Sequence, residues 1–304
     1  MQIDDSAPTL PLSPLDPRLP LGMPFTPAMA RAVGIPRSAL DRMLRDGLLR
    51  RVLRGVYVDA TVLDDPETRA RSVALVLPRG AVVVDRTAAW LHGVEVLRAR
   101  SDLLPPLEVL GRSAAGRPRH FGAERTLISE DVETPYGVPV TTPLRTALDL
   151  GRLLAPDRAL ASMDALLRTR RFTHRELLLQ VERFRHQKGV VQLRRLAPIV
   201  DARASCPAES ILRVRWLEAS LPTPIPRLRA STGAGWLELA LGLEVQRFAA
   251  VLAGQLSGEE REQLTSSGWR IVVLTEERVI RSDPYLVMRH LEREFHQQLL
   301  RQVS

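Results

Sequence analysis

Apolar positions in the segment 25–58 follow the spacing of two short helices and a hairpin. Thr26 followed by Pro27 is typical of a helix start, because a threonine side chain caps free backbone N–H groups and proline fits the first helical turn. We expect this first helix to bury Ala30 and Val33 and to end at Gly34.

A second helix is predicted to begin at Pro36 and to end at Gly47. Its apolar residues recur every three to four positions and form one buried face: Ile35, Ala39, Leu40, Met43 and Leu44. Two strand-like runs, Leu49–Leu53 and Val56–Val58, follow and are separated by an Arg-Gly turn. Two helices joined by a tight glycine turn and followed by a hairpin form a winged helix-turn-helix, whose second helix has the size to enter the major groove of DNA.

Beyond residue 58 the pattern alternates between helical and strand-like periodicity. In the middle of the chain, helices are predicted at 66–77, 87–92, 143–154, 157–167 and 173–196, and strands at 81–84, 107–110, 126–129 and 138–141. In the last hundred residues, the predicted helices span 209–219, 258–266 and 284–302, and the predicted strands span 227–230, 236–241, 243–252 and 270–274. The order helix, strands, helix, strand, helix indicates a separate α/β domain.

A chain of 304 residues, of which 45% are apolar, suggests two or three domains with packed cores. We expect a flexible leader in residues 1–24, which contain six prolines, and a winged helix-turn-helix DNA-binding domain in 25–60. A mixed α/β middle domain is expected in 61–204 and an α/β domain in 205–304. The fold class is therefore predicted to be mixed α+β.

The net charge of +8 is placed unevenly along the chain. Residues 27–58 hold seven arginines and two aspartates, and 59–204 carry a net +5, whereas 205–304 hold twelve arginines and twelve acids. Lys188 is the only lysine, so the clustering of arginine is more informative than its abundance. On this division the N-terminal unit has the densest positive charge, which is the electrostatic signature of a nucleic-acid binder.

The predicted recognition helix has a polar face for DNA contact: Arg37, Ser38, Asp41, Arg42 and Arg45. Arginine pairs with a guanine edge or binds phosphate, and Ser38 lies near the helix start, where backbone N–H groups also bind phosphate. Asp41 would repel phosphate unless it accepts from a cytosine or pairs with Arg37 or Arg45. The predicted wing carries Arg50, Arg51 and Arg54, which are placed to reach the DNA backbone or the minor groove.

The stretch FTPAMARAVGIPRSALDRMLRDGLLRRVLRGVYV, residues 25–58, resembles the N-terminal domain of AbiEi-type antitoxins of type IV toxin–antitoxin systems. The resemblance continues with the motifs TAAWLHG at 87–93 and VTTPLRTALDL at 140–150. It implies an N-terminal domain that represses the chain's own operon, and a middle and C-terminal region that counteracts a nucleotidyltransferase-like toxin. The implied partners are double-stranded DNA of its own promoter and a cognate toxin protein.

The residues of these middle motifs have ordinary structural interpretations. We expect Trp90 and Leu91 in a core and His92 at a helix end rather than as a ligand. Arg145 and Asp149 are four residues apart, so we expect an ion pair on a helix face.

The last hundred residues resemble very-short-patch-repair and restriction-type endonucleases, which bind Mg²⁺ through acids on a first helix and two following strands. Glu209 in the motif PAES matches the first acid, and Glu238 in WLELA matches the second. The next strand has lost its acids, because the corresponding run is Val251-Leu252-Ala253-Gly254; Glu244 lies earlier, roughly 20 Å away along an extended strand. We therefore expect a degenerate endonuclease-like domain with no catalytic residues and no metal, in which Glu209, Glu238 and Glu244 are vestigial.

Other chemistry is not indicated. The sequence has no glycine-rich phosphate loop, no zinc-ligand spacing and no nucleophile–base pair, so neither a cofactor nor an enzyme activity is expected. Cys206, the only cysteine, is interpreted as incidental. No apolar run approaches the roughly 20 residues that span a bilayer, and the N-terminus lacks the basic residues of a secretory signal, so no membrane contact and a cytoplasmic location are expected.

Three functional hypotheses remain open. The first is a DNA-binding transcriptional regulator of the antitoxin type, the second a metal-dependent endonuclease targeted by the winged helix, and the third a protein-interaction module that does not bind DNA. The missing acids in 251–254 argue against the second. The simplest alternative for the N-terminal unit is a small helical cap without a binding role, whose arginines are only solvated.

Overall fold

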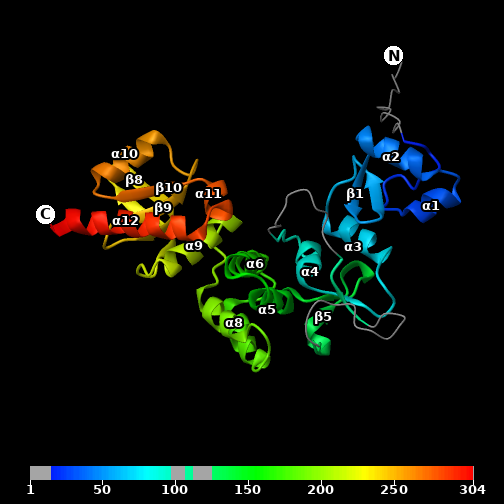
Figure 1. Cartoon of the computed structure of the whole chain (residues 1–304), viewed down its shortest axis with the longest axis horizontal. Helices are drawn as coiled ribbons and strands as arrows, with labels where there is room; N and C mark the ends of the chain where they lie inside the picture. Colours follow the sequence, from blue (N-terminus) through cyan, green and yellow to red (C-terminus); the bar gives the residue numbers. More distant parts are fainter. Residues whose placement is uncertain (1–14, 97–106, 112–124, 304) are drawn as a thin grey trace, which may run out of the picture. The chain divides into compact units, whose positions relative to one another are not determined.

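The computed structural model describes residues 15–96, 107–111 and 125–303, and these form two compact units (Figure 1). Within the described residues, the first unit comprises 15–93, 107–111 and 132–140, and the second comprises 94–96, 125–131 and 141–303. Each unit combines helices and strands, which confirms the predicted mixed α+β fold class. Every helix in the described part of the chain is too short or too polar to cross a membrane.

The first unit begins with the predicted helix pair and hairpin: α1 (Pro27–Ala32), α2 (Arg37–Arg45), β1 (Leu49–Leu53) and β2 (Val56–Asp59). The Thr26 side chain accepts a hydrogen bond from the Met29 N–H at 3.3 Å, which is the helix cap that the sequence predicts. The prediction for Val33 is wrong. Ala30 is fully buried, but α1 ends one residue before Val33, whose side chain is 40% exposed.

Ordered packing begins before residue 25. Leu15 and Leu19 are buried in the same hydrophobic cluster as Phe25 and Leu40, and the Phe25 backbone pairs with that of Tyr57. The structure therefore differs from the expected flexible leader at residues 15–24, because two leucines between the prolines find apolar partners on the helix pair. Residues 1–14 of that leader lie outside the described residues.

The hairpin separates two hydrophobic clusters. Leu49 and Tyr57 belong to the cluster of the helix pair, whereas Val52, Val56 and Val58 belong to a second cluster. That second cluster also contains residues of α3 (Pro66–Ala74), α4 (Asp85–Leu91) and a small sheet. The sheet has the order β4 (Val109–Leu110), β3 (Val82–Val83), β6 (Val140–Thr141) and β5 (Val132–Glu133). Because alternate strand residues face opposite sides, both faces of the hairpin are buried.

The first half of the second unit contains four helices: α5 (Pro143–Leu153), α6 (Pro156–Arg168), α7 (His174–Gln180) and α8 (Val190–Leu196). The prediction of one helix over 173–196 is wrong. A 3₁₀ turn at Val181–Phe184 follows α7, and Gly189, with a φ of +80°, starts α8. The predicted strand at 126–129 is also wrong, because this segment is irregular and leads into a 3₁₀ turn at Ser129–Asp131.

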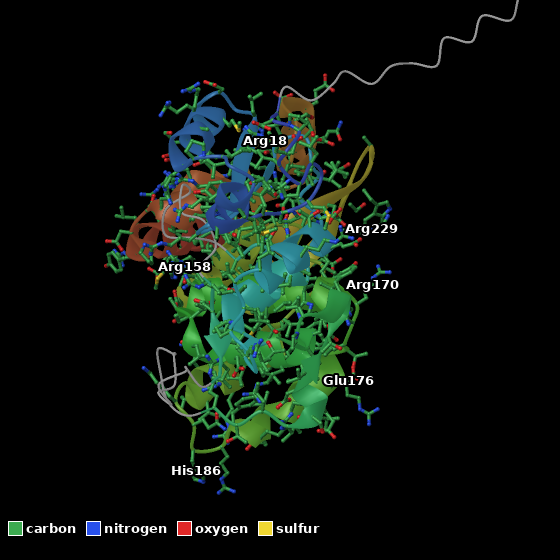
Figure 2. The ribbon with its side chains drawn as sticks, turned by 90° about the vertical axis from the view of Figure 1, so that its right-hand side faces the viewer. Arg18, Arg158, Arg170, Glu176, His186 and Arg229 are labelled. Atoms are coloured by element: carbon green, nitrogen blue, oxygen red, sulfur yellow. The ribbon has the colours of Figure 1, made fainter. Side chains whose placement is uncertain are left out.

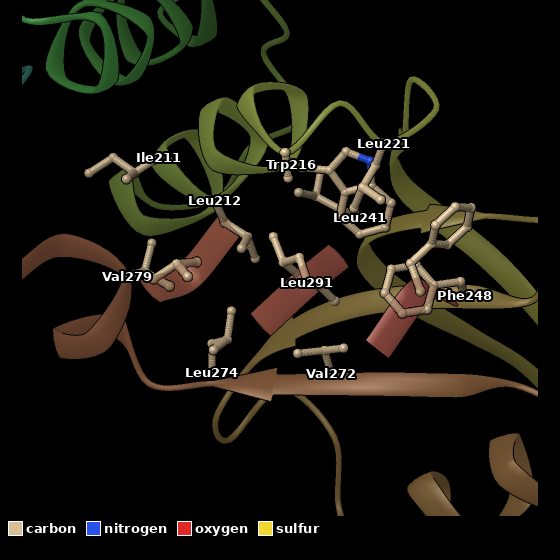
Figure 3. Packing of buried hydrophobic residues seen from close by; sticks show 14 of the residues in the cluster. Ile211, Leu212, Trp216, Leu221, Leu241, Phe248, Val272, Leu274, Val279 and Leu291 are labelled. Carbon is tan, nitrogen blue, oxygen red and sulfur yellow. The ribbon is translucent and has the colours of Figure 1, made fainter. Parts of the chain in front are cut away.

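The second half of this unit has three layers around a four-stranded sheet. The strand order is β10 (Arg270–Leu274), β9 (Phe248–Leu252), β8 (Gly235–Leu243) and β7 (Ile225–Thr232); β9 and β10 are parallel and the other neighbours are antiparallel. One face is covered by α9 (Pro207–Glu218), α11 (Glu276–Arg281) and α12 (Pro284–Val303). Figure 3 shows Trp216 and Leu291 of this layer packed in one cluster with Phe248 of the sheet. The other face is covered by α10 (Gly258–Ser266) through Leu264.

The bounds of α10 and β10 are those predicted. The predicted strand 243–252 begins only at Phe248, because residues 244–247 form the turn from β8. The short helix α11 was not predicted.

Candidate nucleic-acid interface

The outer face of α2 presents the polar residues that the sequence predicts for DNA contact. Four are exposed and the last is half-buried: Arg37, Ser38, Arg42, Arg45 and Asp41. On the opposite face, Leu40 is 1% exposed and packs in the core of the helix pair. In the described part of the chain, no side chain caps the start of α2, which leaves its first N–H groups to solvent or to an anion.

Asp41 lies on this face without the ion pair considered for it. Among residues 15–96, 107–111 and 125–303, neither Arg37 nor Arg45 lies within 4.0 Å of its carboxylate. An exposed pair on one helix gains little energy in water. All three charged side chains are therefore presented separately on the face of α2.

The three wing arginines have different surroundings. Arg50 is half-buried and donates a hydrogen bond to the Val62 carbonyl oxygen at 3.0 Å, so it ties the hairpin to the chain that follows. Arg51 is exposed and its guanidinium lies 5.8 Å from the centre of the Tyr57 ring. Arg54 is exposed at the hairpin turn. Arg51 and Arg54 are thus presented to solvent, while Arg50 has a structural contact.

Two further arginines, which the sequence pattern did not indicate, lie on or beside the helix pair but outside α2 and the hairpin. Arg31 is exposed in the last turn of α1. The Arg18 guanidinium lies beside the turn at Gly34 and donates hydrogen bonds of 2.9 and 2.6 Å to Asp16. These bonds lower the pKa of Asp16 to about 2.

The motif at 87–93 is structural. Trp90 and Leu91 are 5% and 6% exposed, as predicted for core residues. Arg69 on α3 stacks on the Trp90 ring at 5.0 Å and donates a hydrogen bond to the Trp90 carbonyl oxygen at 2.9 Å. His92 follows the end of α4, as predicted, and its Nδ1 lies 3.8 Å from a Glu133 carboxylate oxygen.

The motif at 140–150 contains the predicted Arg145–Asp149 pair, at 2.8 Å, but this pair is buried rather than exposed on a helix face. Asp149 also binds Arg152 at 2.8 Å, and Arg145 binds Asp131 at 2.6 Å. The guanidinium groups of Arg145 and Arg152 lie 5.2 and 5.1 Å from the Phe184 ring. A charged network therefore connects α5 to the segments before and after it in the chain.

Glu209 and Glu238, two of the predicted vestigial acids, lie close together with an arginine between them. Glu209 is 2% exposed, and its carboxylate accepts hydrogen bonds from Gln255 Nε2 at 2.6 Å and from the Ser205 N–H at 2.7 Å. The Arg227 guanidinium lies 3.4 Å from Glu209 and forms a closer ion pair with Glu238. The guanidinium thus pairs with both carboxylates that a metal ion would need and compensates one of their two negative charges.

The third acid that was predicted to be vestigial lies elsewhere. Glu244 is exposed in the turn before β9, whereas Gln255 follows the opposite end of that strand. Val251 and Leu252 are buried, and no group of three or more His, Cys, Asp or Glu within the described residues is arranged to hold a metal ion. Gln255 was missed in the sequence, although it is the first polar residue after the apolar run 251–254.

Comparison with known protein families gives two matches. Residues 22–58 match the family described as "Transcriptional regulator, AbiEi antitoxin", and residues 81–199 match the family described as "AbiEi antitoxin C-terminal domain". The chain belongs to the AbiEi antitoxin family. The AbiEi matches include the face of α2 and the buried Arg145–Asp149 network, and they support a DNA-binding antitoxin role.

Two proteins of Mycobacterium tuberculosis are similar to this AbiEi-family chain. Uncharacterized protein Rv2248 of strain H37Rv and Uncharacterized protein MT2308 of strain CDC 1551 are each 29% identical to it over 273 residues. The similarity covers 84% of this chain and 97% of each relative. Residues 1–199 are too few to supply that share of 304 residues, so the similarity continues into the C-terminal domain that the AbiEi matches leave out.

The AbiEi C-terminal match contains a second basic segment, residues 168–195, with nine basic and two acidic residues. Its net charge of +7 exceeds the +5 of residues 27–58, which corrects the prediction that the N-terminal unit is the most positive. Residues 59–204 as a whole carry only +5, because the rest of that range is slightly acidic. Four of its basic side chains are exposed and have no ion pair among the described residues: Arg170, Arg175, Arg185 and Lys188. Figure 2 shows Arg170 and His186 projecting away from the ribbon.

Proposed function

We propose that this AbiEi-family protein is a DNA-binding transcriptional regulator that represses its own operon and counteracts a nucleotidyltransferase-like toxin. The observation that carries the proposal is the exposed basic face of α2, on a helix pair whose opposite face is buried. A short helix with arginines on its outer face fits the major groove, where bases are distinguished by their hydrogen-bonding edges. Membership of the AbiEi family supports the same function.

The proposed contacts follow from exposure and position. Arg37 and Arg42 on α2 read base edges, because they lie on the face that would enter the groove. Arg51 and Arg54 on the hairpin bind the phosphate backbone. Stacking on Tyr57 limits the motion of Arg51 and reduces the entropy that it loses on binding.

Binding of the full chain to its own promoter fragment over a salt series tests the proposal. Each phosphate that an arginine neutralises releases condensed counterions, so about 4–7 contacts give a log–log slope of about −4 to −6. A random duplex of equal length is the control for sequence preference. A slope near zero, or no binding at low salt, would refute DNA recognition by this face and favour a protein-binding winged domain.

The antitoxin part of the proposal rests on family membership. When a neighbouring nucleotidyltransferase-like gene is expressed alone, it should inhibit growth. Co-expression of the full chain with that gene should restore growth. The Arg37→Ala, Arg42→Ala double variant should lose repression but still restore growth, because the family implies separate regions for the two roles. Failure of the full chain to restore growth would leave a regulator without an antitoxin role.

We further propose that the C-terminal domain is not an active nuclease. Glu209 and Glu238 already bind Arg227, and β9 offers only buried apolar side chains near them. A hard cation needs further oxygen ligands, which the apolar side chains of β9 do not supply. The purified protein should therefore not cut plasmid or single-stranded DNA with Mg²⁺ or Mn²⁺. Cleavage that both Glu209→Ala and Glu238→Ala abolish would establish the alternative, a DNA-targeted endonuclease.

A further inference from the structure

A basic hollow lies between α11 and α12 on the surface of the C-terminal domain. Its volume is about 480 Å³. Three arginines and two histidines contribute to its lining, with one acid and one leucine: Arg278, Arg289, Arg293, His290, His296, Glu292 and Leu286. The sequence does not indicate this site, because residues 205–304 are neutral as a whole.

The spacing along α12 explains how the hollow is built. Positions 286, 289, 290, 293 and 296 recur every three to four residues, so they share one face of the helix. The other face is anchored in the core by Val287, Leu291 and Phe295. Core packing therefore fixes the orientation of α12 and keeps its basic residues on the surface. Arg278 on α11 lines the same hollow.

The positive charge of the hollow is only partly compensated. Arg289 lies 3.6 Å from Glu292, and Arg293 lies 3.4 Å from Glu294. Glu294 is shared with Arg270, which it binds at 2.5 Å. Within the described residues Arg278 has no ion pair. An excess of guanidinium charge therefore remains in the hollow.

The pKa of His290 is consistent with the same excess of positive charge. Burial lowers the pKa of His290, and Arg278, Arg293 and Arg270 lower it further against the opposing effect of Glu294. The Arg293 guanidinium lies 2.9 Å from His290 Nδ1, and because arginine can only donate, Nδ1 accepts. In this neutral form the proton resides on Nε2, which is left as a hydrogen-bond donor.

We infer that this hollow binds a phosphate group. Guanidinium groups donate two parallel hydrogen bonds to phosphate oxygens, and three of them line one concave site with a further imidazole donor. A carboxylate of an acidic protein would accept the paired hydrogen bonds of one guanidinium group but not of three. The phosphate comes either from a nucleotide or from a nucleic-acid backbone, and the two sources are separated by the choice of probe.

Calorimetric titration of the full chain with inorganic phosphate, with ATP and with a random 20-base-pair duplex tests this inference. The duplex arm uses the Arg37→Ala, Arg42→Ala background in every variant, so that failure of DNA recognition by α2 does not affect the result. The test variant is Arg289→Gln, Arg293→Gln, and Arg278→Gln is a second, independent one. The matched control is Arg281→Gln, which removes the same charge from an exposed residue of α11 outside the lining of the hollow.

We expect the double variant to lose at least about tenfold in affinity, because a charge-assisted hydrogen bond contributes that much or more. Arg278→Gln should lose affinity as well, and Arg281→Gln should not. A loss confined to ATP identifies a nucleotide as the source, and a loss confined to the duplex identifies nucleic acid. Equal affinity in all variants, an equal loss in Arg281→Gln, or tighter binding of polyglutamate than of any phosphate probe would overturn the inference.

Discussion

Asp164 and Arg213 form an ion pair between α6 and α9 that is almost completely removed from water. Burial raises the pKa of the Asp164 carboxyl from 3.8 to about 6, and Arg213 opposes that rise. Because the folded state binds this proton more tightly than the unfolded state, the contribution to stability is full below pH 3.8 and is lost as the pH rises to about 6. The loss corresponds to about 3 kcal/mol, at about 1.4 kcal/mol per pKa unit.

Replacement of Arg213 by methionine should therefore destabilise the second unit more at pH 8 than at pH 5. At pH 8 the buried Asp164 carboxylate loses its partner, which costs about 3–5 kcal/mol. At pH 5 the carboxyl takes up a proton and avoids most of that cost. Urea unfolding should give different midpoints for Arg213→Met and for Asp164→Asn, Arg213→Met at pH 8, and converging midpoints at pH 5. Equal differences at both pH values would show that the charge of Asp164 is not the cause.

Gly189 combines a left-handed backbone with a close approach. Its φ is +80°, and a Cβ would lie 1.9 Å from the Arg152 carbonyl oxygen. Gly189→Ala should lower the free energy of unfolding by more than about 3 kcal/mol. The alanine would be strained at this positive φ, and the backbone at Arg152 would also have to move away from the new Cβ. Gly254→Ala is the matched control, because Gly254 has a φ of +90° and open space around it, and it should cost only about 1 kcal/mol. Thermal denaturation compares the two, and equal losses would exclude a role for the contact with Arg152.

At the scale of elements, the hairpin β1–β2 contributes side chains to two hydrophobic clusters. A fragment that ends at residue 60 would expose Val52, Val56 and Val58, each worth about 1.5–3 kcal/mol when buried. That loss is comparable to the whole stability of a small domain. The fragment should lack a cooperative thermal transition, whereas a fragment that ends at residue 141 includes the small sheet and should show one. Cooperative unfolding of the shorter fragment would mean that the helix pair is an independent domain.

The two elements of the proposed DNA interface should respond differently to arginine removal. Arg37→Ala or Arg42→Ala should relax sequence preference by about 1–3 kcal/mol, because base contacts distinguish sequences. Arg51→Ala or Arg54→Ala should weaken binding to all sequences alike. Arg50→Ala should also lower the thermal midpoint, because Arg50 binds the Val62 carbonyl. Anisotropy measurements with promoter and random duplexes check this, and identical losses on both would indicate a nonspecific binder.

The sequence predicts those elements that are determined by interactions between residues close together in the chain. The helix pair, α10 and β10 follow from caps, glycine stops and periodicity within a few residues. The break before α8 depends on the approach of Gly189 to Arg152, far away in sequence. Spacing alone predicts that Arg145 and Asp149 pair, but not that the pair is buried. The same holds for the proposed site: exposure of the α2 arginines follows from helical periodicity, whereas the contact of Arg50 with Val62 does not.

At the scale of the whole molecule, positive charge is concentrated in two segments, and the rest of the chain has a small net negative charge. Residues 27–58 and 168–195 carry net charges of +5 and +7, while 205–304 are neutral. Acids in the second segment are few, and Glu182 is already bound to Arg194 at 2.7 Å. Both segments therefore have the positive charge that would attract DNA in a salt-dependent way, and only the first includes the proposed reading helix.

The triple variant Arg170→Gln, Arg175→Gln, Arg185→Gln separates these two sources. If the second segment contacts phosphates, loss of three contacts should make the log–log salt slope less negative by about 2–3, at about 0.9 per phosphate. Preference for the promoter over a random duplex should persist, because α2 is unchanged. The matched control removes three exposed arginines from the neutral C-terminal domain: Arg261, Arg281 and Arg301. Both variants lower the net charge equally, so a general effect of charge would change both slopes alike. An unchanged slope in the first variant would exclude DNA contact by residues 168–195, since contacts that do not exist cannot release counterions.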